Sequence, residues 1–100
     1  SYNSLTDFQN NIHSIENVWY GGVQGKRSEY SFSSYFKKYD AATGKRVEAA
    51  ITNALKQIKA IKAPFVKNIK DPQCANAINA CKELSDALTA ASDFIGKNNK

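Results

Sequence analysis

The sequence contains few of the residues from which functional sites are usually recognised. It has one histidine, two cysteines and no methionine. Two cysteines are too few for a disulfide framework, and a single histidine restricts any metal site with nitrogen ligands. Because the chain opens on a serine and lacks methionine, we expect a processed chain or a fragment of a longer protein.

Long apolar runs are also missing, so the sequence predicts no transmembrane segment and no signal-like opening segment. The 100 residues include 42% hydrophobic and 23% charged residues, which is typical of one small globular domain. The net charge is +5, but most of it comes from lysines spread thinly among apolar residues. This pattern favours a solvated lysine face over a nucleic-acid partner.

Three stretches have apolar residues at alternating spacings of three and four, the pattern of a helix with one packing face. The first stretch ends at Gly21 and Gly22 and contains Leu5, Phe8, Ile12, Ile15 and Trp19. The second runs to about Ile61 and contains Val47, Ile51, Ala54, Ile58 and Ile61. The third runs from Pro72 to about Ile95 and contains Cys74, Ala77, Cys81, Leu84, Leu88, Ala91 and Ile95.

The segments between these stretches are shorter and more polar. We expect a short aromatic helix over 34–39, a turn or loosened segment over 40–44, and a helical turn or irregular connector over 63–69. Gly96 is expected to stop the last helix. No segment alternates with the period of a strand. The sequence therefore predicts an all-α fold, an antiparallel bundle of three long helices plus one or two short helices, in a single domain over residues 1–100.

Cys74 and Cys81 lie seven residues apart on the last predicted helix. That spacing corresponds to about 10.5 Å along a helix, which is beyond the reach of a disulfide. We interpret both thiols as small buried apolar groups rather than as metal ligands or nucleophiles.

A second stripe on the first predicted helix contains Gln9, His13, Glu16 and Tyr20, about 90° from the apolar face. Residues three apart on a helix can share one ligand, so the His13 imidazole and the Glu16 carboxylate could bind one metal ion together. The same spacing is also typical of two side chains that make only a weak contact on the exposed surface of a helix. A metal site needs three or four ligands, and the other predicted helices contain no recognisable further ligands. Both interpretations stay open on the residues alone.

The stretch NNIHSIENVWYGG (10–22) carries a family resemblance, together with the segment 31–39, the tripeptide 63–65 and the closing helix 84–95. These features resemble the C-terminal of the two helical repeats of the imelysin-like family. The resemblance implies an all-helical repeat that packs against a related N-terminal repeat. It also implies a periplasmic or cell-envelope protein, often a lipoprotein, linked to iron uptake. Members have been classed as metallopeptidases from a GxHxxE motif.

In this chain the window that matches GxHxxE is 11–16, with Asn11 at the glycine position. In the family that motif belongs to the N-terminal repeat. The resemblance implies that His13 and Glu16 are metal ligands, for iron or zinc, and that Asn17 and Tyr20 orient them. The chain would form one wall of a metal- or ligand-binding cleft.

The expected partner is the N-terminal repeat of the same protein, or a second copy that buries the second stripe. One histidine and one glutamate cannot assemble a zinc hydrolase site alone, which leaves enzymatic activity undecided. The alternative from another class is a metal-free helical interaction module whose second stripe packs against a partner.

Overall fold

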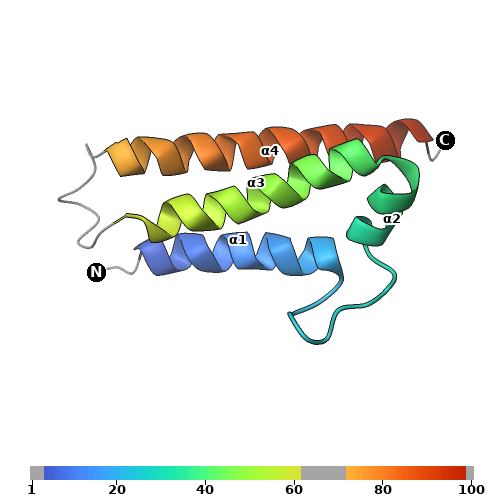
Figure 1. The fold of residues 1–100 in the computed structure, drawn as a ribbon, viewed down its shortest axis with the longest axis horizontal. Helices are drawn as coiled ribbons and strands as arrows, with labels where there is room; N and C mark the ends of the chain where they lie inside the picture. Colours follow the sequence, from blue (N-terminus) through green and yellow to red (C-terminus); the bar gives the residue numbers. More distant parts are fainter. Residues whose placement is uncertain (1–3, 62–71, 99–100) are drawn as a thin grey trace.

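The computed structural model describes residues 4–61 and 72–98, and these form helices and turns without a strand. The helices are α1 (Ser4–Tyr20), α2 (Phe32–Tyr39), α3 (Ala41–Lys59) and α4 (Pro72–Asn98). Figure 1 shows α3 between α1 and α4, running antiparallel to both. The predicted all-α architecture of three long helices and a short one is confirmed. No helix within the described ranges is long and apolar enough to span a membrane.

The centre of the structure is the apolar face of α3. Its predicted residues are all buried, with Val47 and Ala54 completely covered and Ile51 1% exposed. The face of α4 that meets α3 is built largely from small side chains: Ala77, Ala80, Ala87 and Ala91 are buried. Small residues let two helix backbones approach closely, so α3 and α4 form the most extensive helix pair of the fold.

The short helix α2 closes the end of the bundle where α4 finishes (Figure 1). Phe36 of α2 is fully buried, and its ring lies 5.3 Å from that of Trp19 and 5.6 Å from that of Phe94. The aromatic cluster therefore joins α1, α2 and α4. Burial of such rings contributes much of the core energy in a domain of this size.

Three boundaries differ from the sequence expectations. Residues 40–44 do not loosen the chain: α3 begins at Ala41, because the Asp40 carboxylate accepts a hydrogen bond from the Thr43 N–H at 3.2 Å. Helix α2 begins at Phe32, because Ser31 caps it through the Ser34 N–H. Gly96 does not stop α4, which continues to Asn98. The predicted connector over 63–69 lies outside the described residues.

The predicted end of the first helix is confirmed. Gly21 has a φ of +82°, the left-handed conformation that glycine adopts most easily. The Gly22 N–H donates to the Asn17 carbonyl at 2.7 Å, and the Gly21 N–H donates to the Val18 carbonyl at 3.4 Å. This pair of bonds is a Schellman motif, which satisfies the last carbonyls of α1 and directs the chain into the loop before α2.

Candidate functional site

His13 and Glu16 meet on the surface of α1. His13 Nδ1 lies 3.0 Å from Glu16 Oε1, and the two side chains are 45% and 24% exposed. One helical turn of α1 brings them together, as their spacing predicts. Because both side chains are partly exposed to solvent, a ligand from outside α1 can reach the pair.

Tyr20 ends the same stripe and is partly buried, with both acidic and basic side chains near its phenol. Burial raises the pKa of its phenol, the carboxylates of Glu48 and Glu16 raise it further, and Arg27 lowers it. The Arg27 guanidinium lies 4.3 Å from the centre of the Tyr20 ring, a cation–π geometry. Two carboxylates and one guanidinium therefore have opposite effects on the pKa of the Tyr20 phenol.

Glu48 of α3 organises the contact between α1, α2 and α3. Its Oε2 atom accepts hydrogen bonds from Trp19 Nε1 at 3.0 Å and from Ser33 Oγ at 2.7 Å. The sequence pattern does not single out Glu48 as a functional residue. The only signal was that a buried tryptophan N–H needs an acceptor, and nothing in the spacing shows which carboxylate supplies it.

The His13–Glu16 pair brings together two side chains of the kinds that bind metal ions. Imidazole nitrogen and carboxylate oxygen are ligands that suit iron or zinc. Within 4–61 and 72–98, however, no group of three or more His, Cys, Asp or Glu side chains could hold a metal ion. Of the four predicted site residues, only His13 and Glu16 share a side-chain hydrogen bond in the described structure. Asn17 and Tyr20 lie beside them on α1 without such a bond to either.

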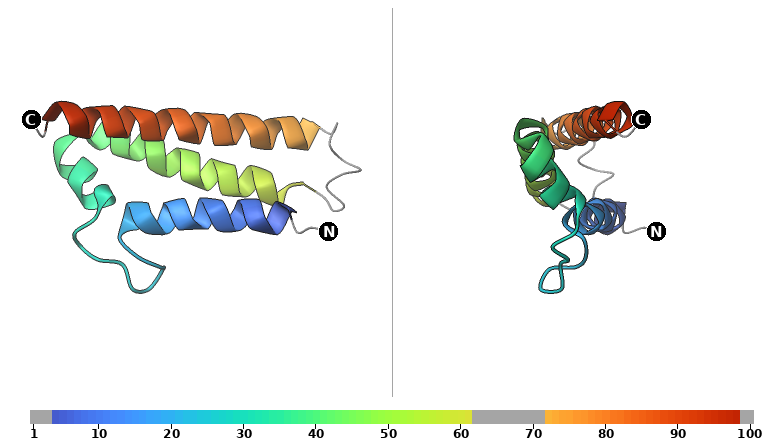
Figure 2. Two further views of the ribbon diagram at one scale, coloured as in Figure 1. Left: turned by 180° about the vertical axis from the view of Figure 1, so that it is seen from behind. Right: turned by 90° about the vertical axis from the view of Figure 1, so that its right-hand side faces the viewer.

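A groove that the sequence does not predict lies along the edge of α1 opposite His13 and Glu16. Viewed end-on in Figure 2, α1 and α4 stand apart on the same side of α3. Between them is a cavity of about 610 Å³, and an adjoining cavity of about 500 Å³ continues it along the helices. We call the two together the α1–α4 groove. They share Ile15, Leu88 and Ser92 in their walls.

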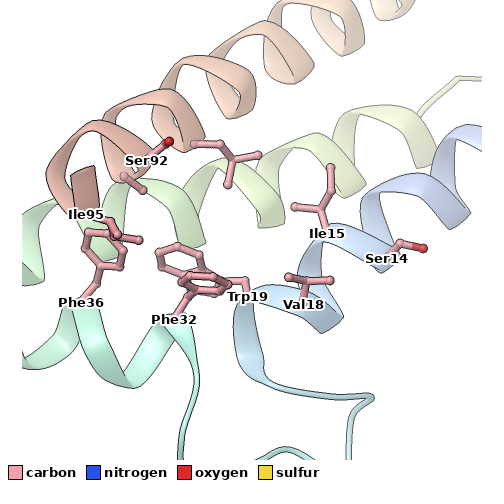
Figure 3. Close-up of a pocket in the computed structure, with 10 residues that line it drawn as sticks. Ser14, Ile15, Val18, Trp19, Phe32, Phe36, Ser92 and Ile95 are labelled. Carbon is pink, nitrogen blue, oxygen red and sulfur yellow. The ribbon is translucent and has the colours of Figure 1, made fainter. Parts of the chain in front are cut away.

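Most of the described residues that line the α1–α4 groove are apolar. Figure 3 shows Phe36 and Ile95 at the end of the groove next to α2, with Val18 on the α1 wall and Ser92 on the α4 wall. Phe8, Cys81 and Leu84 line the other end. Among the residues that the structure describes, no Asp, Glu, Lys or Arg side chain lines either cavity. The groove arises because the apolar faces of α1 and α4 are each wider than the part that α3 covers.

The fold and the site define a helical-bundle module with a histidine–glutamate pair on one edge of α1 and an open apolar groove on the other. The chain belongs to the imelysin family: the sequence model of that family, which carries a peptidase label, matches residues 1–91. Searches of curated proteins and of solved structures found no match. The family resemblance carried by residues 10–22 is therefore confirmed.

Proposed function

We propose that this chain forms one wall of a metal-binding cleft in an imelysin-family envelope protein linked to iron uptake. His13 and Glu16 supply two ligands, and a second helical unit of the same protein, the N-terminal repeat, supplies the others. The observation that supports this proposal is the 3.0 Å approach of His13 Nδ1 to Glu16 Oε1 on a solvent-accessible ridge. Two ligands already in contact need little rearrangement to bind one ion.

The charges around the ridge support a cation as the ligand. The carboxylates of Glu16 and Glu48 both act on Tyr20 at the end of the stripe, where the Arg27 guanidinium opposes them. A divalent or trivalent ion that binds at His13 and Glu16 would be attracted by the same two carboxylates. Asn17 and Tyr20 flank the pair and would orient a ligand or a metal-bound water from the side.

Calorimetric titration with ferrous, ferric and zinc ions tests the proposal. Binding by the longer protein that carries both repeats should be saturable, and His13→Ala or Glu16→Gln in it should weaken binding at least about tenfold because each removes one ligand. Glu83→Gln is the matched control, since Glu83 is an exposed glutamate on α4 far along the chain from the pair. Absent binding, or binding that survives His13→Ala, contradicts the proposal.

A second candidate function is a metal-free helical interaction module, and the α1–α4 groove is the observation that favours this function. An apolar groove between two helices is a common receptor for a further helix. In this case a tight partner contact survives His13→Ala. If the partner instead covers the second stripe, the contact fails with Tyr20→Ala.

Peptidase activity is a third candidate, and it rests on the family label alone. A hydrolytic metal site holds about three protein ligands and an activated water, whereas the described residues bring two ligands together. The activity therefore requires the longer protein. The measurement is hydrolysis of a peptide substrate by that protein, lost on chelation and restored by the metal.

A further inference from the structure

One end of the bundle carries most of the net positive charge. Residues 21–46, which form the loop after α1, the helix α2 and the start of α3, contain six Lys or Arg and two acidic residues, a net charge of +4. The other 74 residues contain eight basic and seven acidic residues, a net charge of +1. Figure 1 shows the loop, α2 and the start of α3 together at the end where α4 finishes. The charge is therefore concentrated in space as well as in sequence.

The same end of the bundle exposes large aromatic side chains. Tyr30 is 85% exposed, Tyr39 is 58% exposed and Phe32 is 45% exposed. Phe32, Tyr35 and Tyr39 are three and four residues apart, so they share one face of α2. The rings of Tyr35 and Tyr39 lie 4.9 Å apart. Aromatic rings that are exposed together indicate an interaction surface.

Two exposed lysines of α2 stand beside these rings. Lys38 lies about 160° around the helix from the buried Phe36, so it points away from the bundle. Its Nζ atom lies 5.2 Å from the centre of the Tyr39 ring. Lys37 precedes it in the last turn of α2. Within the described residues, neither lysine forms an ion pair with a carboxylate, so both ammonium groups can meet an anionic partner.

We call these side chains together the α2 surface: Tyr30, Phe32, Tyr35, Tyr39, Lys37 and Lys38. A cavity of about 400 Å³ opens beside its aromatic part, and Tyr30, Phe32 and Tyr35 line it. Lysines next to exposed rings and a small hollow match a phospholipid surface, which offers anionic headgroups above an apolar layer. Recognition of bases and phosphates in nucleic acids instead favours arginine, and the α2 surface contains none.

We propose that the α2 surface docks onto an anionic lipid bilayer. The ammonium groups of Lys37 and Lys38 lie among the phosphates, and the tyrosine rings enter the headgroup region with their hydroxyls in water. The docking is reversible and weakens with salt, because no apolar segment anchors it. It does not depend on the proposed metal cleft, since His13 and Glu16 lie on α1 outside this surface.

Cosedimentation with vesicles in the presence of a metal chelator tests the proposal. The protein should bind vesicles of equimolar phosphatidylglycerol and phosphatidylcholine at low salt. It should bind phosphatidylcholine vesicles at least about tenfold more weakly, and high salt should remove most of the difference. A protein that binds neither kind of vesicle at low salt overturns the proposal.

A pair of lysine variants tests the position of the contact. Lys37→Gln with Lys38→Gln should weaken binding to the anionic vesicles roughly 25-fold, about fivefold for each lysine. Lys56→Gln with Lys59→Gln is the matched control, because both are exposed in the last turn of α3, at the other end of the bundle, and the net charge falls equally. The control should bind like the wild type. Equal losses in the two double variants overturn the proposal.

Aromatic variants separate a bilayer from other anionic partners. Tyr30→Ser and Tyr39→Ser should each weaken vesicle binding at least about threefold, also at salt concentrations that remove the effect of the lysines. Ile78→Ser is the control, since Ile78 is 67% exposed on α4 outside the α2 surface. Circular dichroism verifies that every variant is helical. Binding to a DNA duplex that depends on Lys37 and Lys38, without binding to vesicles, overturns the proposal.

Discussion

Gly44→Ala should destabilise the protein, although alanine is the better helix former. Gly44 is buried in α3 at the point where α2 crosses it. A Cβ atom built on Gly44 would lie 2.9 Å from the Cβ of Phe36. Neither atom can rotate away, because each is bonded directly to its backbone. The substitution must therefore push α2 away from α3 and disturb the Phe36 ring contacts with Trp19 and Phe94.

The expected change in the free energy of unfolding combines two opposing effects. Replacing glycine inside a helix stabilises it by up to about 1 kcal/mol. Overpacking a fully buried contact costs about 2–3 kcal/mol, near the top of the usual range, because Phe36 is completely buried. The net loss is about 1–2 kcal/mol, which corresponds to a fall in Tm of roughly 4–16 °C for a domain of this size.

Gly96→Ala is the matched control. Gly96 also lies in a helix, but a Cβ there would have no heavy atom within 4 Å. Only the helix preference remains, and fraying near the end of α4 reduces it, so stability should rise by about 0.5 kcal/mol or less. Urea unfolding followed by far-UV circular dichroism measures both variants. If Gly44→Ala is as stable as Gly96→Ala, the close approach of α2 to α3 is wrong.

Three further predictions concern the polar contacts and one thiol. Glu48→Ala should lower the free energy of unfolding by about 1–3 kcal/mol, because it leaves the buried Trp19 N–H without its acceptor. Glu48→Gln keeps an acceptor and should cost less, so chemical denaturation that finds the two variants equally stable contradicts this prediction. Burial raises the pKa of Tyr20, so its phenol ionises at lower pH in the unfolded chain than in the folded one, and stability falls as pH rises above about 10. Tyr20→Phe should make this alkaline loss of stability smaller, as unfolding measured at several pH values can show. Burial raises the pKa of the Cys81 thiol, so iodoacetamide should alkylate Cys81 more slowly in the native chain than in urea at the same pH, as site-resolved mass spectrometry can measure.

The helices could be predicted from the sequence because each carries its own local signal. The apolar spacing of α3 and the pair Gly21–Gly22 depend on neighbouring residues only. The His13–Glu16 contact also follows from spacing within one helix, and the structure shows it at 3.0 Å. Boundaries such as Asp40 were misjudged because turn and cap residues are the same types, and only the backbone geometry shows that Asp40 caps α3.

The groove and the role of Glu48 could not be predicted, because both depend on how the helices are placed against one another. An apolar seam identifies the buried face of a helix but not how much of it a neighbour covers. Ile12 is buried while Phe8, four residues earlier on the same seam, is half exposed. Glu48 lies next to the apolar residue Val47, and only the crossing of α1 over α3 brings the indole of Trp19 to it.

The His13–Glu16 pair and the α1–α4 groove occupy different edges of α1, so a change in one should not affect the other. His13 and Val18 are five residues apart, which places their side chains about 140° apart around the helix axis. Val18 is 65% exposed, so Val18→Lys should leave the fold intact, and metal titration of that variant should give wild-type affinity. If Val18→Lys weakens metal binding, α1 does not keep its two edges separate.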